Sequence, residues 1–372
     1  MTAGTLELGF EELLADHAYA EPLVVDGVHC HGGFDADGTY LSPRTLHRVP
    51  AIAAWEAQRL EESGTAILDV PLETWPENFP NVAQTKFLLR HGVREPTIAA
   101  LTRIGTVESF GAMLRLLPLP DFAGCFVEDI TGTTVSHIGG GLFEAHARDE
   151  SGFGGLAGHD RMWFVARDIA FESPPTEDIT ARMMARMGID PTPKSDEQLA
   201  QARRAQLAGR VLPDDVDFTL ELVVGRMIGL LLIEISAFHG FRWAEAVLAD
   251  GELVAGDGTA ARLVSYIRAD ETPHVAYLRT ALSEMRDRTW KGKGSNRYAG
   301  ADMVGRLWDR AVADSLLLRR SENLAFVMDE IEQAVARHPG GDGLVEEMLS
   351  LGSVVRLADG RLADAEGDHL LG

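Results

Sequence analysis

The stretch Leu230-Leu231-Leu232-Ile233-Glu234-Ile235 places one carboxylate inside an otherwise apolar run. It belongs to a longer segment, residues 215–248, that lacks proline and is longer than an ordinary strand. Residues 227–238 are apolar on nearly every side, which predicts a helix buried in a larger bundle. An ionised carboxylate taken out of water is costly unless it is paired or coordinates a cation. Glu234 therefore needs a partner, either an arginine or a metal ion.

A second stretch, Asp270-Glu271-Thr272-Pro273-His274, supplies a matching pair of side chains. Glu271 and His274 are three residues apart and project from neighbouring turns of one helix face. Di-iron and di-manganese carboxylate bundles use such a pair opposite a lone Glu on another helix. Glu234 lies 37 residues before Glu271, which fits two antiparallel helices joined by a short loop. Pro273 removes a backbone donor and predicts a bend between the paired ligands.

Composition limits the classes of partner and of cellular location. The chain has 372 residues, enough for one large domain or two ordinary ones, and its 45% hydrophobic content is that of a globular protein. A formal charge of −23 argues against nucleic acid and anionic membranes as partners. Cys30 and Cys125 form no CxxC motif, and the N-terminus has no signal-peptide pattern. We therefore expect a cytoplasmic protein without disulfides or a membrane span.

The first 80 residues predict a small α+β segment. We expect helices at 8–18 and 43–62, the second capped by Ser42, and strands at 23–28 and 65–70. The motif His29-Cys30-His31 follows the first of these strands. It resembles the metal-binding opening of the amidohydrolase superfamily, which would make the protein a metal-dependent hydrolase. The alternative is a turn whose histidines only pack or form hydrogen bonds.

The remaining chain predicts helices, so the fold class is mainly α. A helical metal-binding bundle is expected over 81–290, and C-terminal helices with an acidic tail over 291–372. Within the bundle we expect an exposed connection or lid at 173–213, because prolines flank two charged helical patches there. Helices are predicted at 82–90, at 95–117, at both ends of 125–150, at 160–172 and within 301–337, with a short hairpin at 351–360.

The spacing of carboxylates leads to a family resemblance. Glu108 precedes Glu144 by 36 residues, close to the spacing of Glu234 and Glu271. With the Glu271-Thr272-Pro273-His274 motif, these residues resemble the ferritin-like di-iron carboxylate superfamily, in particular its oxidases and N-oxygenases. The resemblance covers about a third of the chain. It implies that Glu144 and Glu271 bridge two ions, and that Glu108, Glu234 and His274 are terminal ligands.

One part of the family pattern is missing, because the histidine after Glu144 is His146 at i+2, about 200° around a regular helix. The first half-site therefore lacks an assigned histidine. The residues available for it are His137, His146, His159 and His239. A second resemblance, to haem-oxygenase-like di-iron oxidases, uses Asp270 with His274 on the last helix. In that version, Glu150 and His159 supply the carboxylate and imidazole of a preceding helix.

Both resemblances imply the same chemistry. Two iron ions, or manganese in their place, would activate dioxygen to oxidise a small organic substrate, with N-oxygenation of an amine as one case. No dinucleotide fingerprint is present, so electrons would come from an external donor. A homodimer is compatible with the sequence, and the substrate is left open. The alternatives are the hydrolase and a helical binding or iron-handling protein in which Glu234 and His274 form a satisfied core pair.

Overall fold

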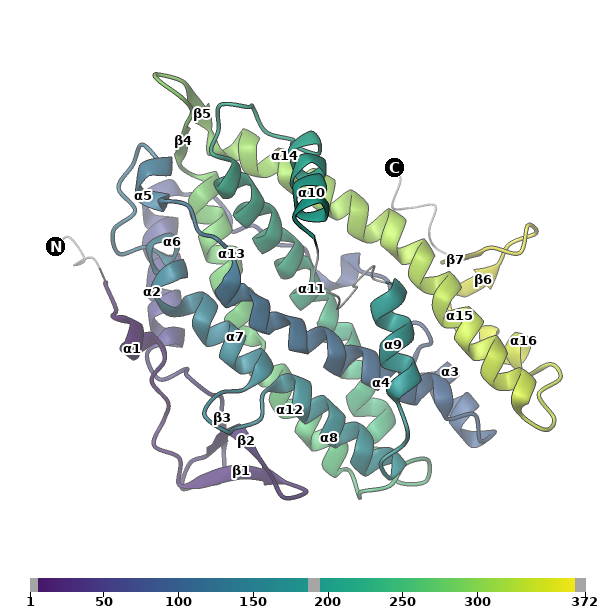
Figure 1. Ribbon diagram of the computed structural model, residues 1–372. Helices are drawn as coiled ribbons and strands as arrows, with labels where there is room; N and C mark the ends of the chain where they lie inside the picture. The colour runs from purple at the N-terminus through teal and green to yellow at the C-terminus, as the bar shows by residue number, and fades with distance from the viewer. Residues whose placement is uncertain (1–5, 187–194, 365–372) are drawn as a thin grey trace.

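The computed structural model of the protein describes residues 6–186 and 195–364, and it is mainly helical, as predicted. Figure 1 shows its long helices side by side, with the N-terminal sheet at one end and the C-terminal helices along one flank. The central helices are α4 (Glu95–Glu108), α7 (Phe143–Ser151), α8 (His159–Phe171), α11 (Phe218–Leu248), α12 (Thr259–Asp270) and α13 (Thr272–Arg286). A small N-terminal sheet accompanies this bundle, which confirms that part of the predicted class.

Helix α11 is the longest element of the bundle, with 31 residues. Its N-terminus is capped by Asp217, whose side chain accepts a hydrogen bond from the Leu220 amide at 2.9 Å. Most of its apolar side chains are buried, although Ile233 is 47% exposed. Its neighbour Glu234 is only 6% exposed, so the predicted burial of this carboxylate is confirmed.

A break interrupts the last two helices of the bundle, where the sequence predicted a bend. Helix α12 ends at Asp270 and α13 begins at Thr272, with Pro273 in the first turn of α13. Proline suits that position because the first turn of a helix needs no backbone donor. Glu271 lies at the junction and is 1% exposed. The break therefore turns this carboxylate into the interior of the bundle.

The N-terminal segment differs from its prediction in detail. The motif expected to form a turn lies in a strand, because residues 26 and 27 make the turn instead, with φ values of 50° and 73°. The antiparallel sheet has the order β1 (Glu21–Val25), β2 (Val28–Phe34), β3 (Tyr40–Leu41). Helix α2 (Arg48–Ser63) begins later than the predicted cap Ser42, and the predicted strand at 65–70 is absent.

The remaining elements connect and cover this core. The predicted exposed connection contains α9 and α10, but residues 187–194 of it, like 365–368 of the acidic tail, lie outside the described residues. The other helices are α1 (Phe10–Leu13), η1 (Leu72–Thr74), α3 (Val82–Arg90), η2 (Ser109–Leu116), α5 (Phe122–Cys125), α6 (Thr134–His137), η3 (Ile138–Leu142), α9 (Glu177–Arg186), α10 (Asp196–Ala208), α14 (Gly300–Ala313), η4 (Asp314–Leu318), α15 (Arg319–Arg337) and α16 (Leu344–Leu349). Two further hairpins pair β4 (Thr289–Lys291) with β5 (Arg297–Ala299), and β6 (Val354–Arg356) with β7 (Leu362–Asp364).

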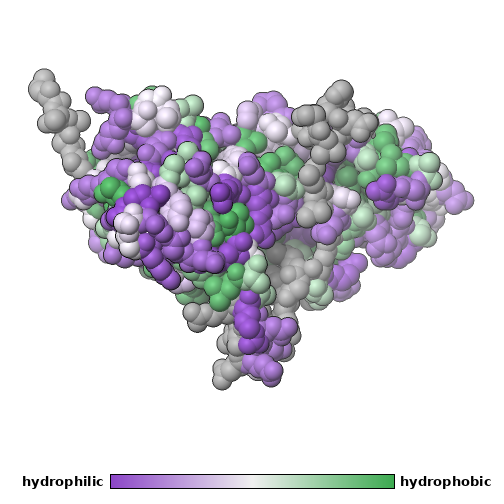
Figure 2. All heavy atoms as spheres, turned by 90° about the horizontal axis from the view of Figure 1, so that it is seen from above, coloured by the Kyte–Doolittle hydropathy of each residue, from purple (hydrophilic) through white to green (hydrophobic). Residues whose placement is uncertain are grey.

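The apolar interior has two main clusters along the central helices. One contains the first part of α11 and most of α13, and the other contains the end of α11 with α8 and α12. Glu234 and Glu271 lie where these clusters meet. Outside, Figure 2 shows hydrophobic residues in separate groups among hydrophilic ones. None of the described helices is both long and apolar enough to cross a membrane.

Candidate metal centre

Helix α7 contributes two ligand-type side chains from one face. His146 and Glu150 are four residues apart, so they project from successive turns, and both are buried. The break before α7 allows this helix to enter the interior. At this break, Gly141 has a φ of 147°, a left-handed conformation that only glycine adopts readily. It lies next to the side chain of Leu13.

One oxygen of Glu150 lies at the centre of three imidazoles. Its Oε1 is 3.4 Å from His146 Nε2, 3.4 Å from His159 Nδ1 and 3.4 Å from His274 Nδ1. A charge-assisted hydrogen bond between such groups would be about 2.7–2.9 Å long. The Oε1 atom is buried and has no hydrogen-bond partner among the described residues. The three nitrogens surround the oxygen at the spacing of ligands that share an ion.

Glu271 lies between two of the same histidines. Its Oε1 is 2.9 Å from His159 Nδ1, and its Oε2 is 2.6 Å from His274 Nδ1. Gly158, directly before α8, lets the start of that helix approach the end of α7, because a Cβ there would come within 2.2 Å of the Gly152 amide nitrogen. The two oxygens of one carboxylate therefore face two different imidazoles, as a bridging carboxylate would.

Two overlapping groups of side chains result, and Glu150 belongs to both. In each group the potential ligand atoms lie within 4.8 Å of one another. The first group is His146, Glu150, Glu234 and His274, and the second is Glu108, Glu150, His159 and Glu271. Glu234 Oε1 lies 3.2 Å from His146 Nε2, whereas Glu108 Oε1 accepts a hydrogen bond from Trp163 Nε1 at 3.1 Å. The alternative partner for Glu234, an arginine, is not among its described contacts, whose ion-pair partner is His146.

Electrostatics show that the carboxylates crowd one another. Burial, followed by the charges of Glu108 and Glu271, raises the pKa of Glu150 well above its usual value. Burial, followed by the charge of Glu234, does the same to the pKa of Glu271. Burial alone would lower the pKa of His159, but Glu271 and Glu150 outweigh it and raise that pKa. Such a concentration of buried negative charge is what a bound cation would compensate.

Each of the three histidines uses its other ring nitrogen for a contact outside the two groups. His274 Nε2 lies 2.8 Å from Asp149 Oδ2, and His146 Nδ1 lies 3.0 Å from the Tyr277 hydroxyl. His159 Nε2 faces Asp270 Oδ2 at 3.5 Å. Metal-ligating histidines are commonly oriented by a second hydrogen bond. The outer contacts of His274 and His146 are of this kind, whereas that of His159 is an ion-pair contact without a hydrogen bond. The inward-facing nitrogens of His146 and His159 have no hydrogen-bond partner among the described residues and are free to coordinate.

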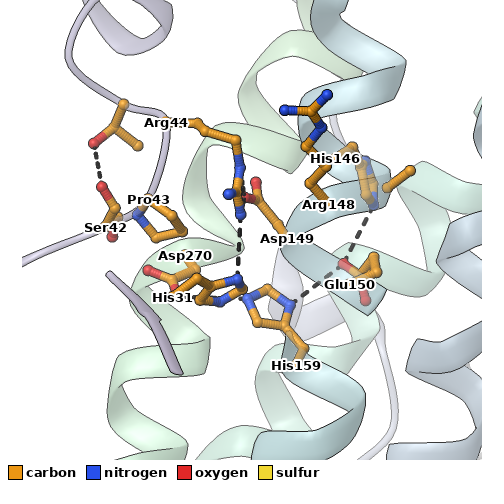
Figure 3. Close-up of polar contacts among 12 residues, drawn as sticks. His31, Ser42, Pro43, Arg44, His146, Arg148, Asp149, Glu150, His159 and Asp270 are labelled. Carbon is orange, nitrogen blue, oxygen red and sulfur yellow. Dashed lines mark hydrogen bonds and ion pairs between the residues drawn. The ribbon is translucent and has the colours of Figure 1, made fainter. Parts of the chain in front are cut away.

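Asp149 is itself held by two buried arginines. Arg44 Nε donates to Asp149 Oδ1 at 2.7 Å, and Arg48 Nη2 donates to Asp149 Oδ2 at 2.7 Å. Burial would raise the pKa of Asp149, but the two guanidinium groups outweigh it and hold the pKa well below its usual range. Asp149 is therefore an ionised acceptor for His274. Figure 3 shows Asp149 beside Arg44, with Glu150 and His159 below.

A third group contains His31, His159 and Asp270, all buried. His31 Nε2 lies 3.4 Å from Asp270 Oδ2, which also accepts a hydrogen bond from the Tyr40 hydroxyl at 2.9 Å. His29 belongs to none of the three groups and is exposed, although residues two apart on a regular strand share a face. The register of β1 and β2 shifts between His29 and Gly33, and Gly32 has a φ of 75°. The structure therefore does not bring His29 and His31 to one site.

Most of the sequence-predicted residues meet at this centre. Glu108, His146, Glu150, His159, Glu234, Asp270, Glu271 and His274 all belong to the three groups. Glu144 does not, because its half-buried carboxylate lies beside Arg148 Nε at 2.7 Å and Arg115 Nε at 3.5 Å. Glu150 lies between the histidines where Glu144 was expected. No sequence signal pointed to Asp149, and none to Arg44.

Comparison with known proteins gives no relatives for this arrangement. No family model matches the chain, and no curated protein or solved structure does so either.

Proposed function

We propose that the protein is a non-haem di-metal oxidase or oxygenase of the ferritin-like or haem-oxygenase-like kind. The observation that supports this most strongly is the position of Glu150 Oε1, buried and without a hydrogen bond, 3.4 Å from three imidazole nitrogens. Adjacent ligands of an ion with bonds of about 2.1 Å lie about 3 Å apart. Glu150 Oε1 is thus spaced from the three imidazole nitrogens for coordination better than for hydrogen bonding.

In this proposal the ligands are divided between two ions. One ion would be held by His146, Glu234 and His274, and the other by Glu108 and His159. Glu150 and Glu271 would contact both, because each lies between histidines of the two sets. This assignment gives Glu150 the bridging role that the family resemblance implies for Glu144.

The donor set favours iron or manganese. Four carboxylates and three imidazoles suit these ions, whereas structural zinc prefers thiolate. Neither cysteine belongs to the three groups, and burial raises the pKa of Cys30 to about 11 and that of Cys125 to about 11. When bound, a pair of reduced iron ions would supply the electrons that activate dioxygen.

The protein's own residues would orient the ligands and exclude water. Asp149 and Tyr277 fix the ring planes of His274 and His146 through the hydrogen bonds described above. Trp163 and Tyr277 are both fully buried beside the ligands, so bulk water is kept from this side of the centre. The oxidised product would be that of a small organic substrate, and an external donor would return the electrons.

Metal analysis and oxygen uptake test this function. Purified protein loaded anaerobically with Fe(II) should hold two irons per chain and consume dioxygen with a change in the near-ultraviolet spectrum. The H159A variant should hold fewer irons. The H29A variant, which replaces an exposed histidine of β2, should hold two. Protein that binds no iron or manganese would contradict the proposal. Zinc that is lost in H29A and H31A would favour the hydrolase instead.

A further inference from the structure

Arg44 occupies a constrained position between the N-terminal sheet and the metal centre. Its backbone φ is 53°, a left-handed conformation that is uncommon for arginine, and its amide donates to Asp16 Oδ1 at 2.7 Å. Its side chain is buried, with a residue exposure of 4%. A buried cation with a strained backbone requires strong compensating contacts.

The first of these contacts leads to one half of the centre. The Nε and Nη2 atoms of Arg44 both donate to Asp149 Oδ1, the former at 2.7 Å. The other oxygen of this carboxylate faces His274 Nε2 at 2.8 Å. Arg44 therefore holds Asp149, the residue that orients His274. In the proposed centre, His274 belongs to the same ion site as His146 and Glu234.

The second contact leads to the other half. Arg44 Nη2 lies 3.2 Å from His31 Nδ1, as Figure 3 shows. A guanidinium group can only donate, so His31 Nδ1 accepts and the ring proton lies on Nε2. That N–H points at Asp270 Oδ2 at 3.4 Å, and Asp270 faces His159 Nε2. Arg44, His31, Asp270 and His159 thus form a continuous line of polar contacts, of which the two to Asp270, at 3.4 Å and 3.5 Å, are ion-pair contacts and not hydrogen bonds.

The geometry points to Arg44 as a positioning residue that orients ligands of both halves of the centre at once, through Asp149 to His274 and through His31 and Asp270 to His159. This inference rests on the proposed function. Its consequence is that the affinities for the two ions depend on one guanidinium group. Loss of Arg44 should weaken both binding steps.

The neighbouring residues provide matched controls. Arg48 is equally buried and donates to Asp149 Oδ2 at 2.7 Å and to the Pro43 carbonyl at 3.2 Å, but it has no described contact with His31. His31 belongs only to the path that leads through Asp270 to His159. R48M should therefore weaken one binding step and H31Q the other, whereas R44M should weaken both. Loss of an outer partner of a ligand typically costs about 10–100-fold in metal affinity.

Titration of metal-free protein with Mn(II) tests the inference. Equilibrium dialysis gives the two dissociation constants, and electron paramagnetic resonance distinguishes one bound Mn(II) from a coupled pair. Wild type should bind two ions, and R44M should show both constants raised about 10–100-fold with a diminished coupled-pair signal. R48M and H31Q should each show one raised constant. Circular dichroism of the metal-free variants establishes that they are folded.

The outcomes separate the two proposals. Wild-type protein that binds neither Mn(II) nor Fe(II) overturns the proposed function and this inference together. Wild type that binds two ions, with R44M shifting only the step that R48M shifts, overturns the inference alone. If R44M does not fold, R44Q is judged by the same criterion, because its shorter side chain has one amide nitrogen in place of the two guanidinium nitrogens that contact Asp149 and His31. Both steps weakened in R44Q supports the inference, and one or none overturns it.

Discussion

Replacing Glu150 with glutamine should have opposite effects on the metal-free and metal-loaded proteins. Glu150 and Glu271 are buried, and the ligand atoms of the group that contains both lie within 4.8 Å of one another. At an effective dielectric constant of about 20, two unit charges at that separation repel by about 3.5 kcal/mol. The nearby histidines offset part of this repulsion, and so does the protonation that the raised pKa values of Glu150 and Glu271 favour. E150Q should therefore stabilise the metal-free protein by about 1–3 kcal/mol.

With metal in excess the sign should reverse. Glutamine is a poorer ligand than a carboxylate, and Glu150 is the side chain common to both groups. Its loss should weaken metal binding more than about 100-fold, the upper end of the range for residues that only orient a ligand. At a fixed metal concentration, this corresponds to at least about 2.7 kcal/mol of lost stabilisation. E150Q should thus be less stable than wild type when Mn(II) is present.

Urea unfolding measures both effects on the same preparations. Each protein is unfolded after chelator treatment and again with a fixed excess of Mn(II), and the midpoints are compared at constant slope. E144Q is the control, because Glu144 lies on the same helix but pairs with surface arginines, and a surface ion pair contributes about 0–1 kcal/mol. Destabilisation of E150Q by the same amount in both conditions would refute the reasoning and would identify Glu150 as part of a metal-free polar network.

Three further predictions concern the surroundings of the centre. A side chain at Gly111 would place its Cβ 2.2 Å from Glu150 Cγ, so G111A should destabilise the protein by about 1–3 kcal/mol in thermal unfolding; an unchanged melting temperature would contradict this packing. Y277F removes the hydroxyl 3.0 Å from His146 Nδ1 and should raise a Mn(II) dissociation constant about 10-fold, whereas unaltered affinity would show that the hydroxyl does not orient the ring. Burial raises the pKa of Glu284 from 4.5 to about 7, so the folded protein binds this proton more tightly than the unfolded chain, and wild type should lose stability relative to E284Q by up to about 3 kcal/mol as pH rises from about 4.5 to 7. Urea unfolding between pH 5 and 8 measures the difference, and a difference that grows with pH in favour of wild type would contradict the sign.

The long helices of the bundle were predictable because their signals are local. Residues 215–248 carry a continuous apolar pattern, and α11 occupies almost the same range. The break near Pro273 follows from the chemistry of proline. His146 and Glu150 share a helix face at i and i+4, and both reach the centre. A metal-ligating role for these residues stays a prediction.

Other features depend on contacts that no local pattern encodes. The equal spacing that favoured Glu144 assumes two regular hairpins, but η2 and η3 make the chain between Glu108 and Glu150 irregular. The true neighbour of the histidines therefore lies six residues farther along. Arg44 reaches Asp149 across more than a hundred residues of sequence, so its role depends wholly on the tertiary fold. The strand that contains His31 was missed because its glycines resemble a turn.

The N-terminal sheet has a consequence for how the interior opens. His31 lies in the middle of β2, so detachment of that strand would withdraw the His31 ring from Asp270 and from Arg44. Opening of the N-terminal sheet would thus also disturb the candidate metal centre. Amide-hydrogen exchange in β2 should accordingly be slower when metal is bound. Cleavage of the turn at residues 26 and 27 by a protease should weaken metal binding.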